Sequence, residues 1–310
     1  MSLPWANADP GRFDAGNRAA EVLQAMLGSF DVPYLSEMSA KCRPGQWSTQ
    51  RCLFSLPVSS MAPQRLASVL GDTLATLGML EADREAFLAG LADPEALPHF
   101  LHLGVEDDRC KVYWETDSPS EPLPAARRHV MYRAWKWRAD ECAASSDYVL
   151  LPTAHEAREA IEAELECHPM SPMHDVIEQL QISFALAQAA WPPVTVRIEE
   201  MQAGEPTGRD SLNLHLHRAG LPLGTLAGPL FSLAREWQTT SRQTLIDWMA
   251  RHGSETLGNL SFGRGAGEEP FLTCYHGTKR HRSHQVEPPR RSNRIPGTTP
   301  QRKRRHKTQA

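Results

Sequence analysis

The stretch VTVRIEEMQAGEPTGRDSLNLHLHR, residues 194–218, contains two segments in which apolar and polar residues alternate over most of their length. These segments, 194–201 and 211–218, are separated by residues that include Gly and Pro. Alternation with a period of two is typical of a half-buried β-strand, and a turn-rich connection between two such strands is typical of a hairpin. The stretch therefore predicts a β-hairpin with one apolar and one polar face.

Four further hairpins are predicted along the chain. They are 30–38 with 50–57, 100–107 with 110–116, 129–139 with 147–152, and 257–264 with 270–277. Helical spacing of apolar residues marks the segments 63–80, 83–92, 155–166, 174–190, 223–237 and 242–253. Hairpin strands pair antiparallel, and closure of the sheet removes exposed edges. The predicted fold is α+β, a ten-stranded antiparallel closed barrel built from five hairpins and surrounded by α-helices.

The polar faces of these strands are expected to line the interior of the barrel, because outer helices would cover the apolar faces. These faces carry His102, Glu106, Lys111, Tyr113, Glu115, Thr195, Arg197, Glu199, Asn213, His215, His217, Ser261, Thr273 and Tyr275. Small closed barrels are normally filled with aliphatic side chains, so a polar lumen indicates a ligand-holding interior. An open antiparallel sheet with its polar face in solvent is the alternative.

Composition and charge divide the 310-residue chain into a body and a tail. The body, 1–278, is predicted to be a single barrel domain with residues 1–28 at its periphery. Residues 279–310 contain eleven Lys and Arg and one acid, with few apolar residues, and are predicted to be a disordered basic tail that could contact an acidic partner or nucleic acid. No apolar run reaches the roughly 18–20 residues of a membrane span, and no signal peptide is evident, so we expect a cytoplasmic protein with free thiols at its six scattered cysteines.

Several common functional motifs are absent from the sequence. No GxSxG, HExxH or EF-hand pattern occurs, and the Gly-rich segment 263–270 joins two strands instead of opening a helix. WKWR, 135–138, would suit single-stranded nucleic acid, but strand alternation explains it more simply, with its Trp residues packed under helices. His215 and His217 share a strand face, but a metal site would need His102 or Glu199 as a third ligand, so no metal site is predicted.

Three short motifs resemble a known family. Lys111-Val112-Tyr113 and the closing segment Pro270-Phe271-Leu272-Thr273-Cys274-Tyr275, together with LGNLSFGR at 257–264, are similar to strands of the ABBA-type aromatic and peptide prenyltransferases. The order of elements over residues 30–277 also resembles that family. The resemblance implies a ten-stranded barrel ringed by helices, and transfer of a prenyl group from an allylic diphosphate, dimethylallyl or geranyl, to an aromatic or peptide acceptor.

Prenyl transfer needs cations for the departing diphosphate, aromatic faces for the allylic cation and a base for the acceptor proton. The cation candidates are Lys111, Lys136, Arg138 and Arg197. The shield candidates are Tyr113 and Tyr275, followed by Tyr148 and Trp137. The base candidates are Glu106, Glu199 and His215, and the acceptor pocket candidates are Asn213, His217, Ser261 and Thr273. No cofactor is implied, apart from a Mg²⁺ ion that could accompany the diphosphate.

The sequence departs from the family in its histidines. His215 and His217 stand where a Lys-x-Tyr pair would fit, and an unperturbed histidine is mostly neutral near pH 7. A second hypothesis is therefore a non-catalytic binding or assembly protein that holds a peptide or small ligand in the barrel or sheet and an acidic partner on the basic tail. Convergence of the candidate cations on one site would distinguish the enzyme from the binding protein.

Overall fold

The computed structural model describes residues 14–93, 97–116, 128–167 and 172–282. Its strands are β1 Tyr34–Arg43, β2 Gln46–Ser48, β3 Arg51–Pro57, β4 Phe100–Glu106, β5 Arg109–Glu115, β6 Val130–Trp137, β7 Ala144–Leu150, β8 Thr195–Gln202, β9 Glu205–His215, β10 Leu257–Arg264 and β11 Pro270–His281. They form a single antiparallel sheet in the order β1-β3-β4-β5-β6-β7-β8-β9-β10-β11, and β11 pairs back onto β1. The predicted closed ten-stranded barrel is confirmed, which excludes the open sheet, and the short β2 is an additional strand beside β1.

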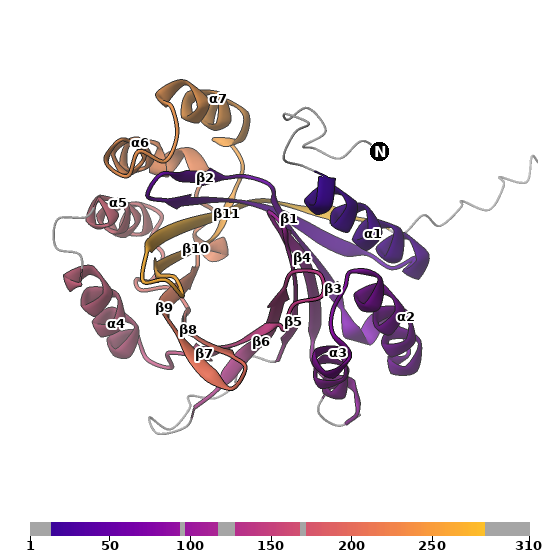
Figure 1. The fold of residues 1–310 in the computed structure, drawn as a ribbon. Helices are drawn as coiled ribbons and strands as arrows, with labels where there is room; N and C mark the ends of the chain where they lie inside the picture. Colours follow the sequence, from indigo (N-terminus) through magenta and orange to yellow (C-terminus); the bar gives the residue numbers. More distant parts are fainter. Residues whose placement is uncertain (1–13, 94–96, 117–127, 168–171, 283–310) are drawn as a thin grey trace, which may run out of the picture.

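Helices surround the barrel in two groups (Figure 1). The described helices are α1 Asp14–Phe30, α2 Pro63–Thr76, α3 Glu81–Leu88, α4 Ala154–Glu166, α5 Met173–Leu186, α6 Ala227–Glu236 and α7 Arg242–His252. Helices α1 to α3 pack on the side of β1 and β3 to β6, and α4 to α7 on the side of β9 to β11. Each group buries its own apolar core against the outer face of the sheet, which leaves the lumen for polar side chains.

The outer face of β5 and β6 shows why the strand pattern is amphipathic. The ring of Trp114 stacks on Phe87 of α3 with centroids 4.4 Å apart, and its Nε1 donates to the Phe87 carbonyl at 2.7 Å. Trp135 and Trp137 are buried on the same face, with Trp137 Nε1 donating to the Leu77 carbonyl. The simpler reading of the 135–138 segment as a packed strand therefore fits the structure, and its Trp rings are not free to stack on bases.

The two ends of the chain differ from the sequence expectation. A helix, α1, precedes the first strand, and its Leu23 and Leu27 are fully buried in the core, so this segment is part of the packed domain and not peripheral. Strand β11 continues through His281, so the barrel extends past residue 278 into the segment that was expected to be tail. The remainder of the predicted basic tail, 283–310, lies outside the described residues.

Within the described part of the chain, no helix combines the length and the apolar character that crossing a membrane requires.

Candidate active site

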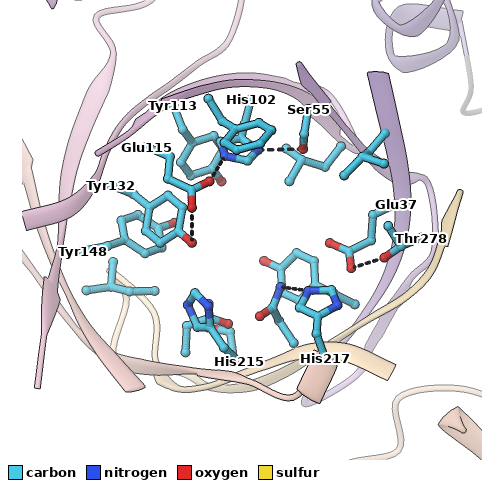
Figure 2. Close-up of a pocket in the computed structure, with 18 residues that line it drawn as sticks. Glu37, Ser55, His102, Tyr113, Glu115, Tyr132, Tyr148, His215, His217 and Thr278 are labelled. Atoms are coloured by element: carbon cyan, nitrogen blue, oxygen red, sulfur yellow. Dashed lines mark hydrogen bonds and ion pairs between the residues drawn. The ribbon is translucent and has the colours of Figure 1, made fainter. Parts of the chain in front are cut away.

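A cavity of about 290 Å³ opens at one end of the barrel lumen. Figure 2 shows its walls, which include Glu37, Ser55, His102, Glu115, Tyr132, His215 and His217. These side chains lie near the starts of β1, β4 and β6 and near the ends of β3, β5 and β9, because antiparallel neighbours bring opposite strand ends to the same rim. The other half of the lumen is filled with charged groups.

A buried cation cluster fills that second half. Four cationic side chains surround the carboxylate of Glu106, which is 7% exposed. Arg51 donates to Glu106 Oε1 in a short charge-assisted hydrogen bond, and Lys41 Nζ lies 4.0 Å from the same oxygen. The other oxygen, Oε2, has Lys136 Nζ at 3.3 Å and Lys111 Nζ at 3.8 Å. The four cations come from β1, β3, β5 and β6, so only the closed barrel brings them together.

Gly104 makes room for one of these cations. It lies directly opposite Lys111 in the β4–β5 register. A Cβ atom at this position would lie 2.8 Å from Lys111 Cε and 2.8 Å from the Cys52 carbonyl oxygen. Any side chain here would therefore force Lys111 out of its path across the lumen.

Arg209 extends the cluster from β9. Its Nη1 lies 3.1 Å from Glu200 Oε2, and its guanidinium carbon lies 5.5 Å from the ring centre of Phe271. Lys41 Nζ lies 4.1 Å from the centre of that same ring. Phe271 therefore contributes a cation–π contact to both Lys41 and Arg209.

Cationic side chains outnumber carboxylates in this cluster by three. Lys41, Arg51, Lys111, Lys136 and Arg209 form ion pairs with two carboxylates, Glu106 and Glu200. Burial lowers the pKa of Lys136 to about 8, although Glu106 opposes the shift, and burial likewise holds the pKa of Lys41 well below its usual range. Burial alone would raise the pKa of Glu106, but Arg51 and the lysines outweigh it and keep that pKa well below normal. A bound anion would balance this excess charge.

Four tyrosines line the cavity, and two of them, Tyr113 and Tyr275, also reach the cation cluster at Lys111. The four are Tyr113, Tyr132, Tyr148 and Tyr275, and we call them the tyrosine belt. The rings of Tyr113 and Tyr132 each lie 5.7 Å from that of Tyr148, edge to face. Lys111 Nζ lies 5.6 Å from the ring centre of Tyr113 and 5.8 Å from that of Tyr275. Burial raises the pKa of Tyr113, Tyr132 and Tyr148, so these phenols stay neutral.

One wall of the cavity is a hydrogen-bonded chain (Figure 2). Ser55 Oγ and Glu115 Oε2 each lie 2.7 Å from a ring nitrogen of His102, Nδ1 and Nε2 respectively. Tyr132 donates to the other oxygen of Glu115 at 3.4 Å. Burial opposes ionisation of Glu115, but the bond to His102 and its charge outweigh burial and lower the pKa of this carboxyl. Glu115 is therefore a fixed, ionised partner of His102.

Glu37 stands on the opposite wall and has a different environment. It is buried on β1, and Thr278 Oγ1 donates to its Oε1 at 3.1 Å. Burial raises the pKa of Glu37 to about 7, against the opposing effects of Thr278 and Lys111. A carboxyl that titrates near neutral pH can accept a proton and release it again, which is what a general base requires.

Three polar atoms in the cavity wall lack hydrogen-bond partners among the described residues. They are Asn213 Oδ1, His215 Nε2 and Asn259 Oδ1, on the adjacent strands β9 and β10. Burial lowers the pKa of His215 to about 4, so its imidazole is neutral. Buried polar atoms are normally satisfied, so this group indicates where a polar ligand would bind.

The structure brings most of the residues expected at the site into the lumen. Lys111 and Lys136 lie in the cation cluster with Thr273 nearby on β11, opposite Lys41. The cavity is lined by Tyr113, Tyr148, Tyr275, Asn213, His215, His217 and Ser261. His217 belongs to a short 3-10 turn after β9 and lies at the exposed rim.

Three expected site residues lie outside the lumen, and a fourth has another environment than expected. Arg138 follows the end of β6 and pairs with Asp108 at the exposed rim. Arg197 and Glu199 point outward from β8, where Glu199 pairs with Arg128. Glu106 is in the lumen, but its lowered pKa makes it an anchor for cations and a poor base. Trp137, a further shield candidate, packs outside the barrel.

The β8 error has a physical cause. Its outward side chains Arg197 and Glu199 are exposed, and Glu199 pairs with Arg128, which also pairs with Asp147 at 2.9 Å. The assumption that helices cover the apolar face therefore fails on this strand, and Ile198 lines the cavity instead. With Glu199 outside and His217 beyond the strand end, the alternative histidine metal set is also not assembled.

Five functional side chains were not predicted from the sequence: Lys41, Arg51, Arg209, Tyr132 and Glu37. Glu37, Ser39 and Lys41 occupy every second position of β1, and Tyr132 and Lys136 are likewise an even number of residues apart on β6. Strand alternation could therefore have identified Glu37, Lys41 and Tyr132. Arg209 was hidden because Pro206 and Gly208 made residues 205–210 look like a loop, whereas β9 begins at Glu205. Nothing in the local sequence around Arg51 distinguishes it from a solvent-exposed residue.

Comparison with known proteins agrees with this architecture. No protein-family model and no curated protein matches the chain. Among solved structures, the chain is similar to 5-dimethylallyl tryptophan synthase from Streptomyces coelicolor in complex with DMASPP and Trp, with a TM-score of 0.57, 12% identity and coverage of 90% of this chain and 92% of that chain. It is also similar to the prenyltransferase PriB in complex with L-tryptophan and dimethylallyl thiolodiphosphate, with a TM-score of 0.57, 13% identity and coverage of 86% and 91%.

A 6-dimethylallyltryptophan synthase from Micromonospora olivasterospora matches with a TM-score of 0.50, 11% identity and coverage of 78% and 81%. Likeness at these identities concerns the fold. The chain thus has the closed helix-ringed barrel of the ABBA-type prenyltransferases, and the distant resemblance inferred from the sequence is confirmed at the level of the fold.

Proposed function

We propose that this protein transfers a prenyl group from an allylic diphosphate to a small aromatic acceptor within the barrel lumen. One observation carries the proposal: a buried cluster of five cationic side chains and two carboxylates meets an aromatic belt, and an open cavity lies beyond that belt. An allylic diphosphate matches this arrangement, because its negatively charged diphosphate would lie among the cations and its apolar chain against the aromatic belt. The fold neighbours crystallised with DMASPP or dimethylallyl thiolodiphosphate support this choice of donor.

The proposed donor site places the diphosphate among the cations and the allylic chain against the tyrosine belt. Lys111 belongs to both parts, because it lies near Glu106 and near two tyrosine rings. Fixed cations stabilise the charge that develops on the leaving oxygen when the carbon–oxygen bond breaks. The electron pair leaves with the diphosphate, and the belt shields the allylic cation from water and stabilises it by cation–π attraction.

Acceptor binding is assigned to the open cavity. Its volume is near the lower end of the range for small-molecule pockets, which favours an acceptor the size of an aromatic amino acid over an extended peptide. The unpartnered polar atoms of Asn213, His215 and Asn259 would bind the polar groups of that acceptor. The acceptor ring then supplies the electron pair for the new carbon–carbon or carbon–heteroatom bond and loses a proton.

Glu37 is the best candidate to receive that proton. Its raised pKa of about 7 suits a group that must be ionised before attack and protonated afterwards. Glu115, the other carboxyl in the cavity wall, is already committed to His102 and Tyr132. We therefore assign Glu37 as general base and the Ser55–His102–Glu115 chain as a positioning wall for the acceptor.

Magnesium is not needed in this proposal. Both carboxylates of the cation cluster, Glu106 and Glu200, are paired with lysine or arginine, so neither is free to hold a metal ion beside the diphosphate. The protein's own cations supply the charge that Mg²⁺ would otherwise bring. Donor binding is accordingly expected to be the same with Mg²⁺ and with a chelator.

The test is thermal unfolding with dimethylallyl diphosphate, geranyl diphosphate and pyrophosphate, followed by product analysis with aromatic amino acids as acceptors. A ligand that binds only the native state raises the midpoint by mass action. A midpoint increase with donor, together with prenylated product, supports the enzyme. Absence of any shift with all three phosphates would exclude the donor site and favour the rival, a non-catalytic barrel that holds a small ligand.

A further inference from the structure

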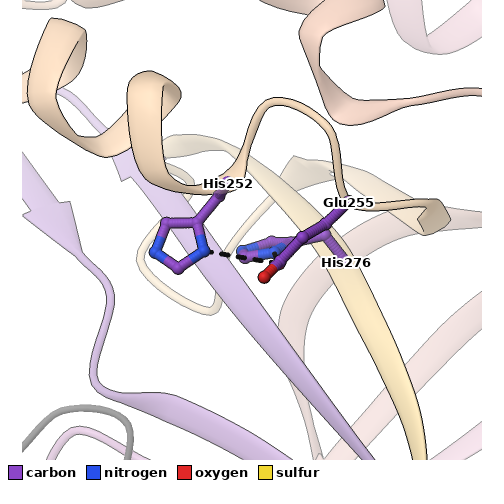
Figure 3. Close-up of side chains that lie close together, drawn as sticks. All are labelled: His252, Glu255 and His276. Carbon is purple, nitrogen blue, oxygen red and sulfur yellow. Dashed lines mark hydrogen bonds and ion pairs between the residues drawn. The ribbon is translucent and has the colours of Figure 1, made fainter.

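Two histidines and a glutamate meet on the outside of the barrel, away from the lumen (Figure 3). His252 ends α7, Glu255 lies in the turn before β10, and His276 is on β11. His276 Nδ1 lies 2.7 Å from Glu255 Oε2, and His252 Nδ1 lies 3.3 Å from the same oxygen. The three potential ligand atoms all lie within 4.8 Å of one another.

Packing holds this group in place. His276 is 1% exposed, and the ring of Trp248 lies 5.4 Å from His276 and 5.8 Å from His252, centroid to centroid. Gly277 has a φ of +70°, and a Cβ atom there would collide with the carboxylate of Glu255. The backbone beside His276 is therefore shaped to admit that carboxylate.

Hydrogen bonding alone does not satisfy the group. Glu255 accepts a hydrogen bond from His276, but His252 Nδ1 is buried and has no hydrogen-bond partner among the described residues, despite its 3.3 Å separation from the carboxylate. A buried ring nitrogen without a partner is costly. A metal ion would satisfy this nitrogen, because a neutral imidazole offers it a lone pair.

We propose that His252, Glu255 and His276 bind a divalent transition-metal ion of the Zn²⁺ type. Two imidazoles and one carboxylate are a ligand set that Zn²⁺ accepts, with a fourth position left for water. Ligand atoms around a tetrahedral Zn²⁺ lie about 3.4 Å apart, given bonds of about 2.1 Å. The His252–Glu255 separation already matches this value, and the His276–Glu255 separation must open by about 0.7 Å.

The bound ion would fix the position of β11, the strand that closes the barrel. His276 lies opposite Met38 of β1 and Leu257 of β10, at the join where the sheet closes. An ion at this position links β11 to the end of α7 and to the turn between α7 and β10. Its expected effect is structural, and the proposal does not depend on prenyl transfer.

The experiment uses the full chain after treatment with a chelator and removal of that chelator. We expect the wild-type protein to bind one equivalent of Zn²⁺ with an increase in the unfolding midpoint, and to give the visible absorption of four-coordinate Co²⁺ when Co²⁺ is added. His252→Ala removes a partly exposed ligand at a helix end and should weaken metal binding by about 100-fold or more, with loss of the Co²⁺ spectrum. Glu255→Gln should do the same.

The matched control is His155→Ala. His155 also lies 3.3 Å from a glutamate, Glu159, but this exposed pair on α4 is not part of a cluster of three ligands among the described residues. The control should bind Co²⁺ and Zn²⁺ as the wild type does. Equal binding by wild type, His252→Ala and Glu255→Gln, or no bound equivalent in the wild type, would overturn the proposal.

Discussion

The ammonium group of Lys111 lies 5.6 Å from the ring centre of Tyr113, and the two residues point into the lumen from the same strand, β5. Lys111 also lies 3.8 Å from Glu106, so it stands where the cation cluster meets the tyrosine belt. In the proposed reaction this is the place where the bond between diphosphate and prenyl group breaks. The first prediction concerns this residue.

Lys111→Met should weaken donor binding while the fold remains intact. Loss of one charge-assisted hydrogen bond costs about 1.5–3 kcal/mol, which corresponds to roughly 10- to 100-fold in affinity. The unfolding midpoint of the free protein should not fall, because the substitution removes one of the excess positive charges. Calorimetric titration with a non-hydrolysable donor measures the effect. Arg138→Gln, a change of cation at the exposed rim, is the control; equal affinities for the two variants would contradict the assigned site.

Glu106→Gln should destabilise the free protein strongly. Removal of one partner from a buried ion-pair network costs about 3–5 kcal/mol, and here four cations would lose their shared carboxylate. Pyrophosphate should restore part of this loss and raise the unfolding midpoint more than it does in the wild type. Glu199→Gln removes an exposed carboxylate and should leave the midpoint nearly unchanged. A Glu106→Gln protein as stable as the wild type would argue against the charge excess.

Donor affinity should fall as pH rises through the pKa of Lys136, about 8. Only the charged ammonium attracts diphosphate, and burial makes this lysine lose its proton early. The native pKa of Lys136 lies below its unfolded value of about 10.5, so between these two pKa values the folded state binds fewer protons than the unfolded state. The stability of the free protein should therefore increase as the pH rises from about 8 to about 10.5. Pyrophosphate titrations across this range provide the measurement. In Lys136→Met this pH dependence should disappear, and its persistence would assign the titration to another group.

Glu37→Gln should reduce kcat by about 100-fold or more, because general base catalysis contributes about 10²–10⁴. In the wild type, kcat/KM should rise with pH through the Glu37 pKa of about 7. In Glu37→Gln this rise of kcat/KM near pH 7 should be absent. The native pKa is raised, so the folded state holds its proton longer, and stability should decrease from about pH 4.5 to about 7. Glu115→Gln is the comparison, since its pKa is lowered and the limb near 7 should remain.

Tyr113→Ala should increase hydrolysis of the donor relative to prenylation. The ring contributes cation–π stabilisation of about 0.5–2 kcal/mol and excludes water from the allylic cation. Tyr113→Phe keeps the ring and should keep the product ratio. Chromatographic measurement of prenyl alcohol against prenylated acceptor separates the two variants. An unchanged ratio in Tyr113→Ala would remove this tyrosine from the shield.

The strand pattern predicted the barrel because a closed sheet divides every strand into two faces. On β5, the alternation of Lys111, Tyr113 and Glu115 with Val112 and Trp114 was enough to separate lumen from core. The same logic failed on β8, where surface ion pairs replace helix packing and the outward face is polar. The alternation of residues along a strand shows which side chains share a face, but the neighbouring elements decide which face points into the barrel lumen.

The sequence by itself determined the order of the five hairpins, the antiparallel pairing within each of them and the polar character of the lumen, because these follow from local periodicity and short connections. Closure of the sheet was decided by the tertiary structure, through the pairing of β11 with β1. Only the tertiary structure decided that Lys41, Arg51, Lys111 and Lys136 share one carboxylate, that Glu37 faces the cavity, and that His252 meets His276. These groups come from strands and helices far apart in the chain. Their charges and pKa values depend on burial and on separations that exist only when the barrel is closed.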